Sequence, residues 1–503
     1  MKNTILDAFD FSVQKFPNNI AISDGNKNTT YQTLQKMAKS VATTLLPMNQ
    51  FRKAILVYID KSVECVASML GVLYSGNFYV VIDTTMPNER IQSIVENLGT
   101  NSVITKKNNT LPMALADLKN ICYFEDCNTI DEDSLQLVRS RIISVDPAYA
   151  LFTSGSTGVP KGCIVTHSNV ISYIDWFGKA FNIDETNVFA SQTPFYFSMS
   201  VSDLYGTLFS GAKIVLIPKM LFMFPTTLLE FLIKNKVNSI YWVPSALNIV
   251  ANTNAFDFVE PMDLQLVLFA GEVMQVHQLN IWRKNIPNAI YANLFGPTET
   301  TDICTYYIVN RDFEESQSIP IGKSCENCDS FAINESGNII SGNEEGELYV
   351  RSSFVAPGYY NFNEKTKEVF VQNPTHNLFP DIVYRTGDIV KFNKYGEYEY
   401  VGRRDFQIKH SGYRIELGEI EAAVSSIEGV LANCCCYDSN EDKLVLFYQG
   451  ESVEDFVREE ITNRLLSYMI PEKIIKIDQM PYNANGKIDR KELKNNYILE
   501  AEE

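Results

Sequence analysis

Through about the first 300 residues, short β-branched or aromatic runs alternate with longer stretches of helical periodicity. The clearest predicted strands are 54–59, 213–217, 239–243 and 266–269, and the clearest predicted helices are 61–74 and 226–236. Such alternation favours parallel sheets covered by helices on both faces, because parallel strands need a long crossover connection. Folds of this kind bind ligands at the carboxyl ends of their strands.

The pattern changes twice in the second half of the chain. From about Gly346, short strands separated by Gly, Asn and Pro turns predict a smaller β-rich subdomain. Beyond about Arg404, the sequence predicts a helix over 416–424, a strand over 443–448 and a helix over 453–468. We therefore predict a large α/β N-terminal domain over residues 1–404, with parallel sheets and a β-rich subdomain, and a small α+β C-terminal domain over residues 405–503.

The charge of the 503-residue chain argues against a nucleic-acid partner. Its 43 Lys and Arg against 61 Asp and Glu give a net charge of −18, which repels phosphate backbones and anionic lipids. No apolar run approaches the ~20 residues that cross a bilayer. Asp7 and Asp10 lie where a secretory signal needs an apolar core. We expect a cytoplasmic protein that neither binds nucleic acid nor inserts into a membrane.

The cysteines and histidines do not follow a metal-binding spacing. Cys325 and Cys328 form a CxxC, and three cysteines run from Cys434 to Cys436, but neither group has the second CxxC or His pair that would complete four zinc ligands. We interpret these residues as buried or incidental thiols in a reduced protein.

The segment 151–162, LFTSGSTGVPKG, has the composition of a phosphate-binding loop. It places four hydroxyl side chains and three glycines around one lysine. Glycines let backbone N–H groups face an anion closely, hydroxyls donate to its oxygens, and lysine supplies the charge. It is not a Walker A loop, because Val159 and Pro160 separate Gly158 from Lys161. A flexible Ser/Gly surface loop is the alternative interpretation.

Several further motifs follow in order along the chain. They are Asn293–Glu299 (NLFGPTE), Tyr384–Asp388 (YRTGD), Gly402–Lys409 (GRRDFQIK) with Gly412–Glu419 (GYRIELGE), and Asn485–Lys491 (NGKIDRK). Together with the phosphate loop, this set resembles the signature of the adenylate-forming superfamily, which comprises acyl-CoA ligases, luciferases and nonribosomal-peptide adenylation domains. The stretch 194–205 is most similar to stand-alone amino-acid adenylation enzymes and D-alanine:carrier-protein ligases.

The resemblance implies ATP and Mg²⁺ as cofactors and assigns residues to them. The phosphate-binding residues would be Thr153, Ser154, Gly155, Ser156, Thr157, Gly158 and Lys161, and the magnesium ligand would be Glu299. Asp388 would bind the ribose hydroxyls near Tyr400. Phe295 would stack on adenine against the backbone of Gly271, Glu272 and Val273, beside Gly296 and Thr298, while Asn293 would read the exocyclic amine.

The resemblance also implies a two-step reaction with a mobile C-terminal domain. Lys487 would stabilise the transition state in which an acid and ATP form an acyl-adenylate and pyrophosphate, because an ammonium offsets the charge of two approaching anions. Asp405 would be the hinge between an adenylating and a thioester-forming arrangement. In the second arrangement Gly412 would line the channel for a pantetheine thiol, and Arg403 would contact nucleotide in one arrangement only.

The residues aligned with the acid-binding pocket are Ser198, Met199, Ser202, Tyr241, Leu268, Ala270, Leu294, Asp302 and Ile303. In amino-acid enzymes the position of Ser198 is normally Asp, because a substrate ammonium in a partly dry pocket needs a counter-ion. The serine therefore argues against an α-amino acid. Asp302 either accepts a hydrogen bond from a distant hydroxyl or amine, as in a hydroxybenzoate or a β-amino acid, or it faces away and caps a turn.

The acceptor is expected to be a separate phosphopantetheinylated carrier protein, because no serine attachment site for such an arm occurs in this sequence. Coenzyme A is the alternative acceptor, and D-alanine or another amino acid is the alternative substrate. A non-catalytic nucleotide sensor would tend to lose Lys487 or the hinge, and both are present. A kinase is disfavoured because no HRD or DFG motif appears.

Overall fold

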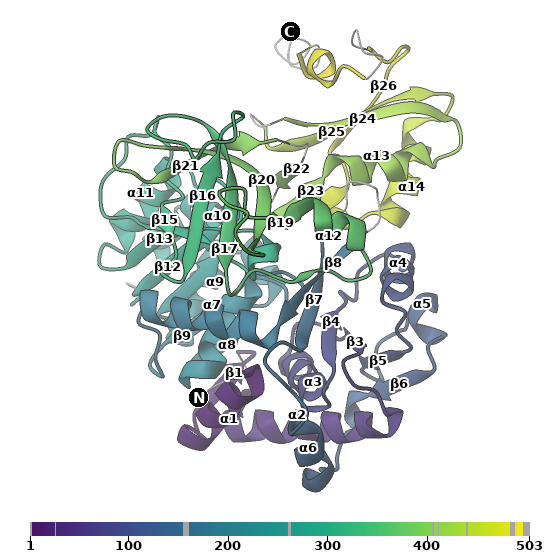
Figure 1. The fold of residues 1–503 in the computed structure, drawn as a ribbon, viewed down its shortest axis with the longest axis vertical. Helices are drawn as coiled ribbons and strands as arrows, with labels where there is room; N and C mark the ends of the chain where they lie inside the picture. The colour runs from purple at the N-terminus through teal and green to yellow at the C-terminus, as the bar shows by residue number, and fades with distance from the viewer. Residues whose placement is uncertain are drawn as a thin grey trace.

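The structure is a computed structural model of the chain. It describes residues 3–25, 27–153, 160–259, 263–404, 407–410, 412–438, 441–482 and 488–495. The predicted Ser154, Gly155, Ser156, Thr157, Gly158, Asp405 and Lys487 lie outside these residues. In Figure 1 the N-terminal helices form the base of the molecule, and the last strands, β24 to β26, lie at the opposite end.

One of the two large α/β sheets has the order β18-β8-β7-β4-β3-β5-β6 in the described residues. Its strands are β3 (Ala54–Tyr58), β4 (Phe78–Val81), β5 (Ser102–Thr105), β6 (Asn120–Tyr123), β7 (Pro147–Thr153), β8 (Lys161–Thr166) and β18 (Gly358–Tyr359). Strands β3 to β7 pair in parallel, whereas β8 and β18 add an antiparallel edge. Because β7 ends at Thr153 and β8 begins at Lys161, the predicted phosphate loop is the hairpin connection between them.

The second large sheet has the order β15-β14-β13-β12-β11-β9-β10-β1-β2. Its strands are β1 (Ile20–Ser23), β2 (Asn28–Thr30), β9 (Val188–Ser191), β10 (Lys213–Leu216), β11 (Ser239–Trp242), β12 (Leu266–Ala270), β13 (Ile290–Phe295), β14 (Thr305–Ile308) and β15 (Lys323–Ser324). The central strands are parallel, and β2, β14 and β15 are antiparallel additions. Parallel sheets are thus confirmed, with antiparallel edges that strand–helix alternation did not predict.

Helices pack on and between these two sheets, as the alternation predicted. They are α1 (Ile5–Lys15), α2 (Tyr31–Leu45), α3 (Val63–Tyr74), α4 (Asn88–Leu98), α5 (Met113–Ala116), α6 (Glu132–Arg139), α7 (His167–Ala180), α8 (Ser200–Ser210), α9 (Pro225–Lys234), α10 (Pro244–Ala251) and α11 (Val276–Asn285). Every residue of helix α3 except Glu64 is buried. Among the described residues, no helix combines the length and the apolar character of a membrane span.

Local chemistry explains where these helices begin. The Thr166 hydroxyl accepts a hydrogen bond from the backbone N–H of Asn169, and the Asn169 side chain accepts one in return, so α7 starts in a capping box. Ser62 caps α3 by accepting a hydrogen bond from the N–H of Cys65, without the reciprocal bond. These caps fix the points at which α3 begins after β3 and α7 begins after β8.

The β-rich subdomain predicted from about Gly346 is confirmed. Strands β16 (Cys328–Ile333), β17 (Gly346–Ser352), β20 (Ile382–Phe392), β19 (Phe370–Gln372) and β21 (Tyr398–Arg403) form one antiparallel sheet, with α12 (Asn363–Val369) beside it. Strands β20 and β21 pair so that Asp388 lies opposite Arg403. Two residues from separate motifs, 15 positions apart in the chain, are therefore cross-strand neighbours.

The C-terminal part is a small α+β unit with hydrophobic clusters of its own. Its elements are β22 (Gln407–His410), β23 (Tyr413–Glu416), α13 (Leu417–Ser425), β24 (Val430–Asp438), β25 (Lys443–Gly450), α14 (Glu454–Arg464) and β26 (Lys473–Lys476). Helix α14 ends earlier than predicted, because Ser467–Met469 forms a separate 3-10 turn. The run from Cys434 to Cys436 is buried in β24.

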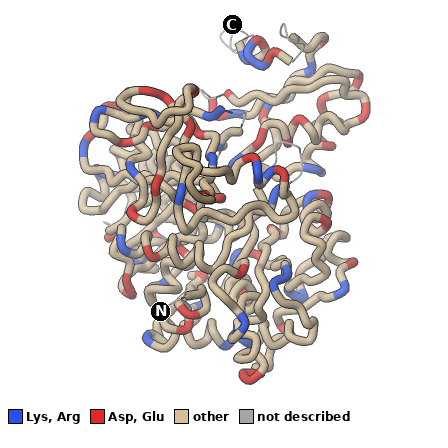
Figure 2. The backbone as a smooth tube through the Cα atoms, viewed as in Figure 1, with Lys and Arg blue, Asp and Glu red and all other residues tan. Residues whose placement is uncertain are grey.

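The C-terminal unit docks on the N-terminal part through the β22–β23 hairpin and α13. Arg90 on α4 forms a buried ion pair with Glu419 on α13, with side chains 5% and 3% exposed. Tyr413 stacks on Tyr468 at 3.7 Å between ring centroids, and its edge meets Phe197 of the N-terminal part at 4.8 Å. Acidic and basic residues are interspersed along the backbone in Figure 2, including at this junction.

Candidate active site

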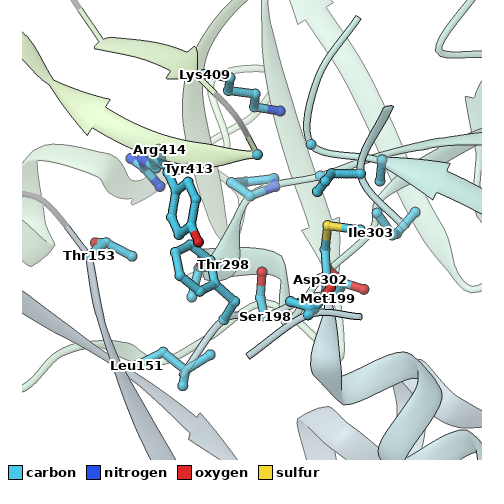
Figure 3. A pocket seen from close by; sticks show the side chains of 18 of the residues that line it. Leu151, Thr153, Ser198, Met199, Thr298, Asp302, Ile303, Lys409, Tyr413 and Arg414 are labelled. Atoms are coloured by element: carbon cyan, nitrogen blue, oxygen red, sulfur yellow. The ribbon is translucent and has the colours of Figure 1, made fainter. Parts of the chain in front are cut away.

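A pocket lies where the carboxyl ends of strands from both large sheets meet the β22–β23 hairpin. It is lined by Leu151, Phe152, Thr153, Gln192, Thr193, Pro194, Tyr196, Phe197, Ser198, Met199, Val243, Ala270, Gly271, Gly296, Pro297, Thr298, Asp302, Ile303, Asp388, Arg403, Gln407, Lys409, Gly412, Tyr413 and Arg414. This is the position at which open α/β sheets bind ligands. In Figure 3, Tyr413 lies between Thr153 on one side and Ser198 with Asp302 on the other.

The predicted site residues divide into those that line this pocket and those behind it. The lining set contains Thr153, Ser198, Met199, Ala270, Gly271, Gly296, Thr298, Asp302, Ile303, Asp388, Arg403 and Gly412. Behind the wall, in adjoining strands and turns and in α8, are Lys161, Ser202, Tyr241, Leu268, Glu272, Asn293, Leu294, Phe295, Glu299 and Tyr400. The structure thus gathers segments from residues 151 to 414 around one cavity.

Asp302 is a buried carboxylate in the wall of the predicted acid pocket, with 1% of its surface exposed. Its Oδ2 accepts hydrogen bonds from the hydroxyls of Ser202 at 2.6 Å and of Tyr173 and Tyr241 at 3.1 Å each. Burial raises the pKa of Asp302 to about 6, although these hydroxyls and that of Ser198 favour its ionised form. Asp302 therefore lines the pocket while its Oδ2 is bonded to hydroxyls behind the wall, and recognition of a substrate hydroxyl or amine by this residue stays a prediction.

A strained turn sets the direction of Asp302. Thr301 has φ +67° and ψ −52°, and the N–H of Asp302 donates to the carbonyl of Thr300 at 2.7 Å. These values define a γ-turn of the rare type, a conformation that costs on the order of 1–3 kcal/mol for a residue such as threonine. The Thr301 hydroxyl donates to the carbonyl of Phe354 at 2.7 Å and holds the turn. The turn separates Glu299 from Asp302, so the two acids face different neighbours.

Glu299 is fully buried beside the predicted phosphate loop. Its Oε2 lies 2.7 Å from Arg414 Nη1, and the Tyr359 hydroxyl donates to Oε1 at 2.5 Å. Burial alone would raise the pKa of Glu299, but Arg414 and Lys161 outweigh it and lower the pKa to about 2. The carboxylate is therefore ionised and is neutralised by an arginine of the C-terminal unit.

Glu299 is also the predicted magnesium ligand, and the acids around it can be compared with the ligands that magnesium takes. In the described part of the chain, no group of three or more His, Cys, Asp or Glu is arranged to hold a metal. Magnesium bound with a nucleotide commonly takes one or two protein carboxylates and fills its shell with phosphates and water. A single buried, ionised glutamate fits that donor set once Arg414 withdraws.

The phosphate side of the pocket has a donor and a cation. The Thr153 hydroxyl is buried and has no hydrogen-bond partner among the described residues. Lys161 Nζ lies 3.7 Å from Glu416 Oε1 of β23, and burial lowers the pKa of this lysine. Both groups are suited to bind an incoming phosphate. In the docked arrangement, Lys161 is paired with Glu416.

The predicted nucleotide residues on the other side are engaged with protein groups. Arg403 Nη1 lies 2.8 Å from Asp388 Oδ1 across β20 and β21. The Asn293 amide donates to the carbonyl of Pro320 at 2.9 Å. Glu272 accepts from the N–H of Ser245 at 2.7 Å, at the start of α10.

Phe295, the predicted adenine-stacking residue, already has two neighbours. Its ring lies 5.9 Å from that of Tyr400, and Lys409 Nζ lies 4.6 Å from its centroid. Lys409, Tyr413 and Arg414 line the pocket without having been predicted as site residues. The sequence did contain a signal for them, because all three lie within the motifs at 402–409 and 412–419.

Comparison with known proteins agrees with this architecture. A family model described as AMP-binding enzyme matches residues 9–360. Zwittermicin A synthase ZmaJ of Bacillus cereus is 30% identical over 98% of this chain and 95% of its own length. The D-alanine–D-alanyl carrier protein ligase of Lacticaseibacillus casei (strain BL23) is 31% identical over 98% of this chain and 99% of its own length.

A solved structure shows the same fold. The Vibrio cholerae adenylation domain AlmE, in complex with glycyl-adenosine-5'-phosphate, aligns with a TM-score of 0.84 over 99% of this chain and 98% of its own, at 22% identity. The chain belongs to the AMP-binding enzyme family, the adenylate-forming superfamily that the motifs resembled. The predicted enzyme class, an AMP-forming acid–thiol ligase of the adenylation type, is confirmed.

Proposed function

We propose that this enzyme activates a small carboxylic acid with ATP as an acyl-adenylate and then transfers the acyl group to the phosphopantetheine thiol of a separate carrier protein. The observation that carries the proposal is a single pocket with a free hydroxyl, Thr153, on its phosphate side and a buried carboxylate, Asp302, on its acid side. The similarity to D-alanine–D-alanyl carrier protein ligases supports a carrier protein as the acceptor.

The first step joins the acid to AMP. An oxygen of the substrate carboxylate attacks the α-phosphorus of ATP, the bond from that phosphorus to the bridging oxygen breaks, and pyrophosphate leaves. In the proposal, Thr153 and Lys161 hold the phosphates and Glu299 holds magnesium, which supplies charge neutralisation at the phosphates when bound. Lys487, which lies outside the described residues, places its ammonium between the two reacting anions.

The second step releases AMP. The thiolate of the carrier's arm attacks the acyl carbon, and the bond between that carbon and the phosphate oxygen breaks. In the proposal, Asp405 is the hinge, Gly412 lines the thiol channel, and the docked β22–β23 hairpin is the thioester-forming arrangement. Its support is the position of Gly412 in the pocket wall, where a Cβ would meet Val243 at 2.6 Å.

The proposed acid lacks a standard α-amino group, because Ser198 stands where an amine counter-ion is expected. A hydroxybenzoate-like acid and a β-amino acid both suit Asp302, which lies in the same wall as Ser198 (Figure 3). D-alanine, the substrate in the name of one relative, is the alternative acid. Coenzyme A is the alternative acceptor.

Pyrophosphate exchange into ATP tests the first step. We expect exchange with at least one acid from a panel of amino acids, β-amino acids, hydroxybenzoates and short fatty acids. Lys487→Ala should lower exchange by at least roughly 100-fold, because it removes the charge that stabilises the transition state. Lys491→Ala, a matched change at an exposed lysine of the same segment, should leave exchange unchanged.

The outcomes separate the proposal from its alternatives. Exchange that is equal in both lysine variants would refute the role of Lys487, and folded protein that exchanges with no acid would refute acid activation. To test the acceptor, the preformed adenylate is offered a phosphopantetheinylated carrier protein or coenzyme A. Faster thioester formation with coenzyme A would overturn the choice of a carrier.

A further inference from the structure

Asp302 is the buried carboxylate at the pocket that lacks a cation. Its partners are the neutral hydroxyls of Ser202, Tyr173, Tyr241 and Ser198, and among the residues that the structure describes none forms a salt bridge with Asp302. Hydroxyl groups solvate a carboxylate but do not neutralise it. A buried charge without a counter-ion is costly unless a ligand supplies one.

The neighbouring buried acid, Asp203, differs from Asp302 because a cation lies near it. Asp203 follows Ser202 on α8 and is also 1% exposed, and it does not line the pocket. Burial raises the pKa of Asp203 to about 7, and Lys61, which lies near it and donates to the carbonyl of Ser191 at 2.8 Å, opposes this increase. Of these two buried carboxylates, Asp203 is therefore the one that has an ammonium, that of Lys61, near it.

From this arrangement we infer that the substrate acid carries an ammonium group and that Asp302 is its counter-ion; this inference rests on the proposed function. The inference favours a β-amino acid over a hydroxybenzoate-like acid, the two substrates that suited Asp302. A phenol or alcohol would donate one further neutral hydrogen bond to a carboxylate that already accepts several. An ammonium would supply the missing charge, and Ser198 Oγ offers a second acceptor for its N–H groups.

The inference also explains the serine at position 198. A carboxylate at 198 as well as at 302 would place two acids within reach of each other, because the Ser198 hydroxyl already interacts with Asp302. Like charges at such a distance cannot both stay ionised in a dry pocket. Serine at 198 leaves Asp302 as the single counter-ion, presented from the loop after η5 (Thr298–Thr300) and not from the segment that leads into α8.

The test is pyrophosphate exchange by the full chain with acids matched in shape but not in charge. The pairs are β-alanine and propionate, 3-aminobutanoate and butanoate, alanine and propionate, and 4-(aminomethyl)benzoate and 4-methylbenzoate, with 4-hydroxybenzoate as a neutral donor. We expect the best amine to exceed its uncharged partner by at least roughly 100-fold in kcat/KM. A best substrate that is a hydroxybenzoate or an unsubstituted acid would overturn the inference and leave the proposed acid activation intact.

Variants locate the counter-ion. Asp302→Asn keeps the shape and removes the charge, so it should lower kcat/KM for the amine by at least roughly 100-fold, mainly through KM, and should spare the uncharged partner. Asp203→Asn is the matched control at a buried acid outside the pocket and should retain the preference for the amine. Equal preference in the Asp302→Asn and parent enzymes would overturn the inference.

A double variant guards against a folding defect. Ser198→Asp combined with Asp302→Asn moves the carboxylate from position 302 to position 198 and restores the charge count. We expect it to recover exchange with an amino acid whose ammonium lies at a different carbon, with thermal unfolding confirming the fold. If neither amine position is recovered in a folded double variant, Asp302 is not the counter-ion.

Discussion

At the scale of single residues, the ionisation of Asp302 makes substrate recognition dependent on pH. Burial raises the pKa of Asp302 to about 6. The groups that face it are the hydroxyls of Ser198, Ser202, Tyr173 and Tyr241, with the Asp203 carboxylate nearby. A protonated Asp302 is neutral and cannot pair with an ammonium, so amine binding weakens below this pH.

We therefore predict that kcat/KM for the best amine rises as pH increases through about 6 and is level above it, because the ammonium itself stays protonated until about pH 10. Exchange assays across pH measure this profile. Asp302→Asn is the control and should lose the rise. A parent profile that stays level from pH 5 to 8 would contradict the prediction.

At the scale of secondary-structure elements, the β22–β23 hairpin is positioned by charged and aromatic contacts with the N-terminal part. Arg414 reaches Glu299, Glu416 reaches Lys161, and Tyr413 packs against Phe197. The hairpin thus occupies the residues that the family motifs assign to phosphates and magnesium. In the proposed function, docking and triphosphate binding would use the same side chains.

Arg414→Leu tests the contribution of this hairpin. The change leaves Glu299 buried without its arginine, and loss of one partner of a buried pair costs about 3–5 kcal/mol. We expect undocking of the C-terminal unit, seen as a larger radius of gyration in small-angle X-ray scattering. Arg458→Leu removes the same charge from an exposed pair on α14 and should leave the radius unchanged. Equal radii for both variants would show that the pair does not hold the hairpin.

At the scale of the whole molecule, the competition between docking and ATP predicts a nucleotide-dependent shape. A non-hydrolysable ATP analogue with magnesium should displace Arg414 and Glu416 and move the C-terminal unit, because Glu299 and Lys161 are then drawn to the nucleotide. Hydrogen exchange at the β22–β23 hairpin should increase with the analogue. Adenosine, which lacks phosphates, is the control and should have no effect; the same exchange with both ligands would contradict the competition.

The sequence alone was sufficient for much of the fold and part of the site. Strand–helix alternation predicted parallel sheets covered by helices, and the change near Gly346 predicted the β-rich subdomain, because apolar periodicity is a local property of the chain. The motifs named Asp388, Gly271 and Ser198, all of which line the pocket. The antiparallel edge strands were missed because strand direction depends on which neighbours pair, which local patterns do not encode.

What the sequence determined by itself is the family, the order of the elements and the residue types available for chemistry, since these follow from motifs and short-range periodicity. The tertiary structure alone decided which of those residues meet. The strained turn at Thr301 places Asp302 in the pocket wall, and the docked hairpin pairs Arg414 with Glu299 across 115 positions of the chain. Both depend on contacts between distant segments, whose energies exist only once the chain has folded.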